Sequence, residues 1–274
     1  MILAFKKHPM TKFSYEIGRF VYLPGRNIYS CHIRISPKAI SKLDAILDVL
    51  KVFIQRKLPI VHLKISRPTE NKPIDIIVFI DLTEKKRKRE MNDTLKEIRA
   101  LPLVDYVELK EPTFKGLAVC DKFYLLTIMG ERAIILRRTL YEIFAKSLRD
   151  ELGSGYVVWL YQLGIELGRN SYRYNRKLVG DDIDKLIAMG SVMFGQAGFG
   201  KLEVVKVDFS SGRAIIRVYD SFECELYKGS GKASSYFIRG IIKGYAQEVF
   251  RKEVVVTETK CIAKGDSYCE FVIS

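Results

Sequence analysis

Hydrophobic and polar positions follow a regular order along the first part of the chain. Residues 28–35 (IYSCHIRI) alternate as in a strand, and two more strand-like runs follow at 60–66 and 75–82. Between the first two runs, apolar side chains fall on one helical face, and Ser36-Pro37 supplies an N-cap and a first helical residue. The apolar positions of that face are 40, 43, 46, 47, 50, 53 and 54. A helix over 90–100 and a strand over 104–110 complete the order βαββαβ.

This order predicts a ferredoxin-like unit, an antiparallel sheet with both helices on one face. Its order and length resemble ACT-type regulatory domains, with residues 21–50 in the place of their first strand, turn and helix. The resemblance implies an ACT-like domain over residues 1–112. ACT domains that bind amino acids usually carry Gly or Asn at the turn after the first strand, whereas this chain has Ser36-Pro37-Lys38. For this unit the resemblance therefore implies pairing, as in a homodimer.

The second part of the chain has a different pattern. Residues 111–120 (EPTFKGLAVC) are typical of a linker, and helical patterns follow over 138–153, 156–174 and 182–196. Strand patterns over 201–209 and 213–222 flank a Ser-Ser-Gly turn, which indicates a hairpin. A helix over 234–250 and two closing strands, EVVVTET and YCEFVIS, complete the pattern. We therefore expect an α+β domain over residues 120–274.

Composition narrows the class of protein. With 48% apolar and 28% charged residues in 274, the chain is typical of a globular protein. No apolar run approaches the roughly 18 residues of a membrane span, and the apolar stretch at the start is too short for a signal peptide. Five cysteines, an odd number, do not suggest a secreted disulfide framework. We expect a cytoplasmic protein without a membrane partner; the scarcity of Gln and Asn suggests a thermophile, whose cytosol tolerates disulfides.

Positive charge is concentrated in the first part of the chain. The net charge is +14, and residues 1–114 contribute +9 of it, from 22 Lys/Arg against 13 Asp/Glu. Lys85, Lys86, Arg87, Lys88 and Arg89 form an uninterrupted run where the second helix should begin. Five cations would oppose the helix dipole, so we expect a solvated loop or a frayed turn. The run is either a solvated face or a phosphate-binding patch, which leaves nucleic-acid binding as an alternative function.

Four stretches of the second part resemble the 4-vinyl reductase family, which also supplies the phenol-sensing module of bacterial transcription activators. They are YQLGIELGR (161–169), RVYDSFECEL (217–226), SSYFIRGIIKGYAQEVF (234–250) and ETKCIAKGDSYCEFVI (258–273). The resemblance covers about residues 120–274 and implies a cavity for a hydrophobic or aromatic small molecule. The aromatic residues nearest the matching motifs are Trp159, Tyr161, Phe222, Tyr236 and Phe237, which are candidate cavity walls or ordinary core residues. Gly240 and Gly244, spaced one helical turn apart, are expected to allow close helix packing.

The resemblance also implies a zinc site. In the sensor members, zinc is bound by a Cys at the start of the helix before the closing strands and by the Glu and two Cys of the pattern E-x-x-C-x7-C. Glu258, Cys261 and Cys269 match that pattern, but the fourth position falls on Ser235, and a serine hydroxyl is a poor zinc ligand. Cys224 is the available substitute, with Glu223 or Glu225 beside it. A closed set of Cys224, Glu258, Cys261 and Cys269 would hold a structural zinc ion; the alternatives are a Cys261–Cys269 disulfide or inert buried thiols.

These features favour a regulator over an enzyme. No nucleotide-binding loop and no Ser/His/Asp or Cys/His set can be read from the sequence, and a closed zinc site lacks the open position that catalysis needs. None of His8, His32 and His62 has a ligand-type partner at a suitable sequence spacing. We therefore expect a non-enzymatic, dimeric ligand sensor that acts in transcription regulation, with direct DNA binding as a further expectation.

Overall fold

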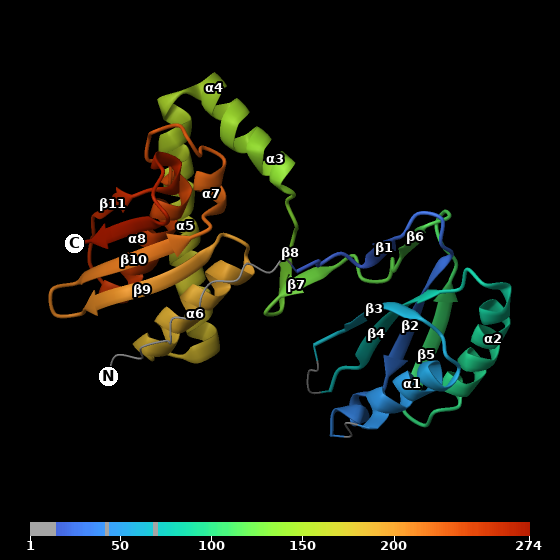
Figure 1. The fold of residues 1–274 in the computed structure, drawn as a ribbon. Helices are drawn as coiled ribbons and strands as arrows, with labels where there is room; N and C mark the ends of the chain where they lie inside the picture. Colours follow the sequence, from blue (N-terminus) through green and yellow to red (C-terminus); the bar gives the residue numbers. More distant parts are fainter. Residues whose placement is uncertain (1–14, 42–43, 68–70) are drawn as a thin grey trace. The chain divides into compact units, whose positions relative to one another are not determined.

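The computed structural model describes residues 15–41, 44–67 and 71–274, which form two compact units that divide between Ile134 and Ile135 (Figure 1). The first contains β1 (Phe20–Tyr22), β2 (Ile28–Ile35), η1 (Pro37–Ser41), α1 (Asp44–Gln55), β3 (Ile60–Ile65), β4 (Ile74–Asp81), α2 (Lys85–Arg99), β5 (Val104–Lys110), β6 (Leu117–Val119), β7 (Leu126–Ile128) and β8 (Glu131–Ala133). The second contains α3 (Arg138–Glu142), η2 (Ile143–Ser147), α4 (Leu148–Leu152), α5 (Ser154–Val179), α6 (Ile183–Gln196), β9 (Lys201–Asp208), β10 (Arg213–Tyr219), α7 (Phe222–Glu225), α8 (Tyr236–Phe250), β11 (Val256–Lys260), η3 (Ile262–Lys264) and β12 (Cys269–Ile273). Among the helices of these described residues, none is both long and apolar enough to cross a bilayer.

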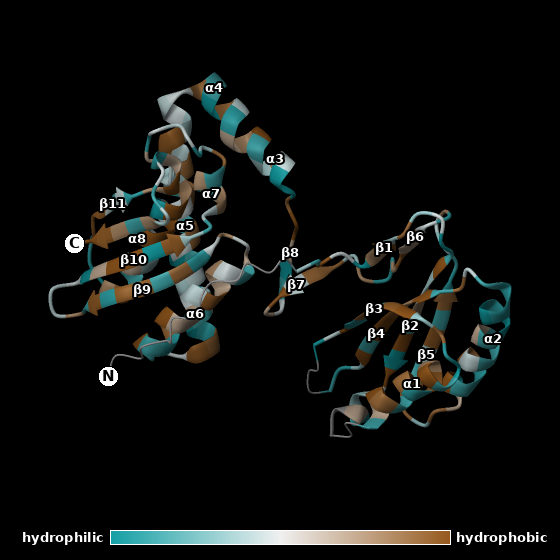
Figure 2. Ribbon diagram, viewed as in Figure 1, coloured by the Kyte–Doolittle hydropathy of each residue, from teal (hydrophilic) through white to brown (hydrophobic). Residues whose placement is uncertain are grey.

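The N-terminal unit is built on an antiparallel sheet in the order β3-β4-β2-β5. Its chain order is the predicted βαββαβ. Alternate residues of β2, including Cys31, Ile33 and Ile35, share one buried cluster with residues of both α1 and α2, so the two helices cover the same face. In Figure 2, α1 is mostly hydrophobic and α2 mostly hydrophilic, as expected of a helix that buries only a narrow stripe.

The buried face of α1 differs from the predicted one. Leu47 and Ile54 are 51% and 68% exposed, whereas Ala45, Val49 and Val52 are buried. The chain begins this region as a short 3-10 helix, η1, and the α-helix starts only at Asp44. Because a 3-10 helix has three residues per turn, an apolar face extrapolated from its residues at 3.6 per turn is rotated. The side chains of residues 40 and 43 lie outside the described part of the chain.

The basic run is helical, so the predicted loop or frayed turn is wrong. Helix α2 begins at Lys85, directly after the extended residue Glu84. Three of the five cations have acidic partners: Lys86 pairs with Glu90 (3.8 Å), Arg87 with Glu84 (2.7 Å) and Lys88 with Glu111 (3.3 Å). These ion pairs and the solvent exposure of the run offset its unfavourable interaction with the helix dipole.

The other face of the N-terminal sheet is partly covered by the segment predicted as a linker. Within residues 111–120, Leu117–Val119 form β6, which pairs antiparallel with β1. Ala118 and Cys120 pack on Ile28, Ile77 and Phe79 of the sheet. These contacts place the segment with the N-terminal unit.

The C-terminal unit has a second antiparallel sheet, in the order β11-β12-β10-β9. Helix α8 contributes Ile238, Ile242 and Ala246 to the cluster that includes Phe271 and Ile273 of β12, so it packs on one face of this sheet. The predicted strand over 213–222 ends at Tyr219, because Ser221 accepts a hydrogen bond from the Cys224 N–H (3.3 Å) and starts the short helix α7.

Four glycines bring α5 and α8 into backbone contact. A Cβ added at Gly164 or Gly168 of α5 would lie under 3.0 Å from backbone oxygens of α8, and one at Gly240 or Gly244 would lie equally close to backbone oxygens of α5. Real Cβ atoms essentially never approach so closely, so these positions accept no side chain without a shift of the helices. The expected role of Gly240 and Gly244 in close packing is confirmed.

We expect Gly164→Ala and Gly244→Ala to destabilise the C-terminal unit by about 1–3 kcal/mol or more, because the added methyl separates the helices. Denaturant unfolding followed by the fluorescence of Trp159, the single tryptophan, measures the change. Gly155→Ala is the matched control: it lies in the same helix with open space around it, and should stabilise by about 0.5–1 kcal/mol. Equal effects at Gly155 and Gly164 would contradict the packing argument.

Candidate functional site

Four of the predicted metal ligands converge in the C-terminal unit. Cys224 lies on α7, Glu258 on β11, Cys261 just after β11 and Cys269 at the start of β12. One ligand atom from each lies within 4.8 Å of the others. The three cysteines are fully buried, and all five cysteines of the chain, each within the described residues, are free thiols. The structure therefore does not contain the alternative Cys261–Cys269 disulfide.

The turn between β11 and β12 orients two of the sulfurs. The Cys261 N–H donates to Asp266 Oδ2 (2.8 Å), and the carbonyl of Cys261 accepts from the Lys264 N–H (2.9 Å). The Ile262 N–H donates to Cys269 Sγ at 3.4 Å. Backbone N–H groups that point at sulfur stabilise a thiolate, so this turn is suited to hold deprotonated cysteines.

Ser235 lies beside the cluster. Its hydroxyl donates to Glu258 Oε1 at 2.6 Å, and its oxygen lies 2.8 Å from Cys224 Sγ. Since the single hydroxyl proton is directed at Glu258, the oxygen is left to accept from the Cys224 thiol. Ser235 thus orients a carboxylate and a sulfur, and Cys224 completes the set of four.

The protonation of the cluster shows that it lacks positive charge. Burial raises the pKa of Glu258 to about 8, against the opposing hydrogen bond from Ser235. Hydrogen bonds from Cys224 and Cys269 lower the pKa of the Cys261 thiol, while the bond to Cys261 raises that of Cys224. One sulfur can ionise only because its neighbours keep their protons. Four ionised groups would need a cation among them.

The residues present fit a zinc ion. Zinc in structural sites has four tetrahedral ligands, with thiolates at about 2.3 Å and carboxylate oxygens at about 2.0–2.2 Å. Ligand atoms around such an ion lie within about 4 Å of one another, and Cys224 Sγ and Cys261 Sγ are 3.5 Å apart. The cluster therefore has the donor types, the number and the spacing that structural zinc requires.

The two acidic neighbours of Cys224 lie elsewhere. Glu223 is 1% exposed, and its carboxylate accepts from the backbone N–H groups of Phe237 (2.9 Å) and Ile238 (3.0 Å), at the start of α8. Burial raises its pKa to about 7, and the two backbone hydrogen bonds oppose that rise. Glu225 is exposed. Glu223 thus fastens α7 to α8 instead of joining the cluster.

The five predicted ligand-binding aromatics lie in three different surroundings. Phe222 and Phe237 belong to a ring cluster with Phe199, with centroids 5.1 to 6.3 Å apart. Trp159 is 55% exposed and stacks on Tyr156, whereas Tyr161 and Tyr236 lie next to cationic side chains. The structure therefore brings only Phe222 and Phe237 together.

Tyr141 joins that ring cluster, and no sequence argument singled it out. Its ring lies 4.5 Å from that of Phe222, and its hydroxyl is buried without a hydrogen-bond partner among the described residues. Burial, and next the charge of Glu223, raise the pKa of this phenol. Tyr141 lies 81 residues before Phe222 in the chain, on a segment with no family-like motif, so sequence alone gave no signal for it. We define the aromatic cluster as Tyr141, Phe199, Phe222 and Phe237.

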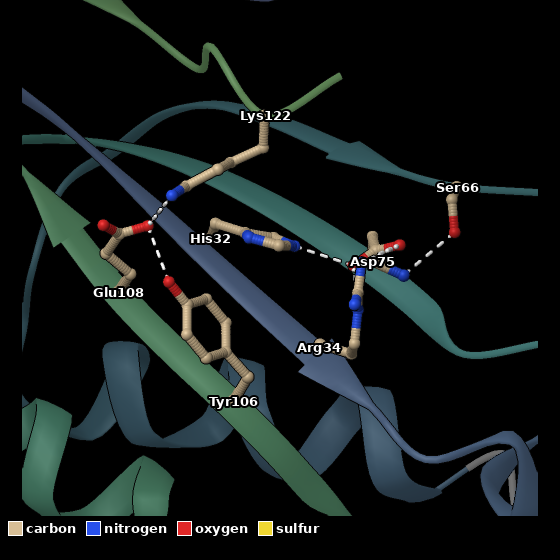
Figure 3. Close-up of polar contacts among 7 residues, drawn as sticks. All are labelled: His32, Arg34, Ser66, Asp75, Tyr106, Glu108 and Lys122. Atoms are coloured by element: carbon tan, nitrogen blue, oxygen red, sulfur yellow. Dashed lines mark hydrogen bonds and ion pairs between the residues drawn. The ribbon is translucent and has the colours of Figure 1, made fainter. Parts of the chain in front are cut away.

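A polar cluster lies on the N-terminal sheet (Figure 3). Asp75 accepts from His32 Nε2 (2.7 Å) and Arg34 Nε (2.9 Å), and its own N–H donates to the Ser66 hydroxyl. Next to it, Glu108 accepts from Tyr106 (2.8 Å) and pairs with Lys122 (3.0 Å). The ring of Phe123 packs against His32 at 5.0 Å. These contacts connect β2, β4 and β5 with the segment after β6; His8 lies outside the described residues.

Comparisons with known proteins agree with the family resemblance in the C-terminal part. Residues 214–274 match the 4-vinyl reductase domain. Over 122 residues the chain is 32% identical to the uncharacterized protein MJ0150 of Methanocaldococcus jannaschii, which corresponds to 44% of this chain and 66% of that protein. A second protein of that organism, the uncharacterized protein MJ1642, is 27% identical over 127 residues, 46% of this chain and 70% of its own length.

Two solved structures are also similar to this chain. One is the phenol-responsive sensory domain of the transcription activator PoxR with phenol, at 18% identity and a TM-score of 0.46, covering 52% of this chain and 76% of that one. The other is a vinyl-4-reductase family protein from Methanocaldococcus jannaschii, at 21% identity and a TM-score of 0.37, covering 52% and 83%.

We expect protein purified without chelator to contain about one zinc per chain, and Cys224→Ser or Cys261→Ser to lose it, because three ligands do not close the site. Elemental analysis with a thiol titration measures both metal and free cysteines. Cys120→Ser, in the N-terminal unit, should keep the metal. Retention of zinc in Cys224→Ser would show that another residue completes the site.

Ser235→Ala should keep the metal but weaken its binding by about 10–100-fold, the usual effect of losing a group that orients a ligand. Competition with a chromophoric zinc chelator gives the affinity. If Ser235→Ala instead loses the metal completely, as Cys224→Ser does, the hydroxyl is itself a ligand.

Proposed function

We propose that this chain, whose residues 214–274 match the 4-vinyl reductase domain, is a non-enzymatic regulator that binds a hydrophobic or aromatic small molecule in its C-terminal unit. A structural zinc ion at Cys224, Glu258, Cys261 and Cys269 would brace that unit. The N-terminal unit would be an ACT-like, ferredoxin-like domain that pairs two chains, and the output would be control of transcription.

The observation that carries this proposal is the sharing of one short helix. Phe222, Glu223 and Cys224 are consecutive on α7, yet each belongs to a different set of contacts. Phe222 lies in the aromatic cluster, Glu223 binds the start of α8, and Cys224 belongs to the metal-type cluster. A ligand that displaces Phe222 would therefore move a helix that is fixed at its next two residues, which is a short route from binding to a change in the unit.

The chemistry of the aromatic cluster indicates the kind of ligand. Its rings offer apolar contact in a place where the Tyr141 hydroxyl has no partner within the described structure. A buried hydroxyl without a partner costs about 1–3 kcal/mol, which a ligand carrying one polar group could recover. The ligand would be a small aromatic molecule with a single hydroxyl or comparable group.

The segment over the aromatic cluster has the character of a movable cover. Tyr141 lies near the end of α3, and the five residues after that helix, Ile143–Ser147, form the π-helix η2. A π-turn is rare within helices and is often found at functional sites. The carbonyl of Ala145, within η2, accepts from the Tyr227 hydroxyl at 2.7 Å. Ligand entry would require this segment to shift, with η2 as the place where the helix yields.

Tyr141→Phe tests the ligand site in two directions. Without ligand, the variant should be as stable as the wild type or more so, because it removes an unsatisfied hydroxyl. With phenol as the probe, affinity should fall by about tenfold, the worth of one hydrogen bond, whereas binding of toluene should not change. Calorimetry and thermal shift measure these quantities.

Tyr124→Phe, an exposed tyrosine of the N-terminal unit, is the control. Failure of phenol, toluene and larger aromatic probes to bind at millimolar concentration would refute the ligand site, and the zinc measurements above would be unaffected. Equal losses for phenol and toluene in Tyr141→Phe would mean that the hydroxyl acts on packing only.

A further inference from the structure

A row of cations and tyrosine rings lies along the start of α8 and its neighbours. Arg149 of α4 lies 5.1 Å from the ring of Tyr227 and 5.8 Å from that of Tyr236. Arg239, one turn further along α8, lies 5.7 Å from Tyr236 on one side and 5.1 Å from Tyr161 of α5 on the other. Lys243 is 5.9 Å from the Tyr161 ring. Cation and ring therefore alternate through Arg149, Tyr236, Arg239, Tyr161 and Lys243, which we name the cation–tyrosine row.

The cations of the cation–tyrosine row lack negative partners. Within the described residues, no salt bridge involves Arg149, Arg239 or Lys243, whereas other arginines of the unit do pair with a carboxylate, as Arg173 does with Glu248 (2.9 Å). All three are half-buried. The Nε atom of Arg239 is buried and has no hydrogen-bond acceptor in the part of the chain that the structure describes. A buried guanidinium N–H without an acceptor is a group that a ligand can satisfy.

The loop between two of the tyrosines adds more positive charge. Residues 228–232 (KGSGK) connect Tyr227 with the segment before Tyr236, and Lys228 and Lys232 are exposed, again without an ion pair among the described residues. Gly229 and Gly231 adopt positive φ values of 85° and 69°. Such a loop exposes backbone N–H groups as well as lysines. Even with the exposed carboxylates of Asp150 and Glu151, which follow Arg149, positive charge is in excess here.

We propose that the cation–tyrosine row and the 228–232 loop form a binding site for a phosphate-bearing small molecule. Arginine presents a planar fork that matches phosphate oxygens, and the tyrosine rings hold the guanidinium planes so that only their edges are free. A nucleic-acid base would need an open ring face to stack on, and here cations of the same chain already lie over the rings. The site lies on other side chains than the aromatic cluster, so it is a separate function and does not rest on the proposed aromatic ligand.

Titration calorimetry of the full chain with inorganic tripolyphosphate, in about 50 mM salt, tests the site. We expect about one binding site per chain, and a loss of at least about tenfold in affinity in the double variant Arg149→Gln/Arg239→Gln, since hydrogen bonds to charged groups are lost. Lys85→Gln/Arg89→Gln removes the same charge from the basic run of α2 and should bind within about twofold of wild type. Tyr141→Phe should also bind tripolyphosphate unchanged.

Arg239→Lys guards against a folding artefact, because it keeps the charge but not the fork; it should fold normally and still bind several-fold more weakly. Equal losses in the Arg149/Arg239 and Lys85/Arg89 variants would overturn the proposal, since attraction to net charge alone would explain them. No binding of tripolyphosphate would also overturn it. So would binding of a single-stranded oligonucleotide that depends on Arg239 and is not displaced by tripolyphosphate, because the site would then serve nucleic acid.

Discussion

The C-terminal unit depends on the backbone contact between α5 and α8. Glycines on both helices remove every Cβ from the contact, so α8 lies between the sheet on one side and the backbone of α5 on the other. The first turn of α8 then has a fixed position, and three features are attached to it. Ser235 precedes it and binds Glu258, Phe237 enters the aromatic cluster, and Arg239 lies in the cation–tyrosine row. A loss of the helix contact would disturb all three.

A second constraint is the cost of burying negative charge. The three thiols and the carboxyl of the metal-type cluster cannot ionise together without a cation, and Glu223 is buried one residue away. The chain separates these charges by direction: Cys224 points to the cluster, and Glu223 points to the backbone N–H groups of α8, where the helix dipole favours an anion. The same short helix can thus serve a metal and a helix start.

Positive charge is distributed differently from what the sequence suggests. The basic run of α2 is the most obvious cationic feature of the sequence, but three of its five members are paired with glutamates. The arginines and lysine of the cation–tyrosine row are scattered over residues 149 to 243 and have no such partners among the described residues. Sequence density of charge is therefore a poor guide to available charge, because neighbouring carboxylates can come from any part of the chain.

The sequence by itself determined the elements that have a strong period and the ligands that have a fixed spacing. The βαββαβ order followed from alternation, and Glu258, Cys261 and Cys269 from one short motif, because both signals are local. Tertiary structure decided the rest: which face α1 buries, that Cys224 and not Glu223 meets the other sulfurs, that Tyr141 covers Phe222, and that Tyr161 and Tyr236 lie beside arginines. These contacts join segments tens of residues apart, and only the packing of helices on the sheet brings such segments within bonding distance.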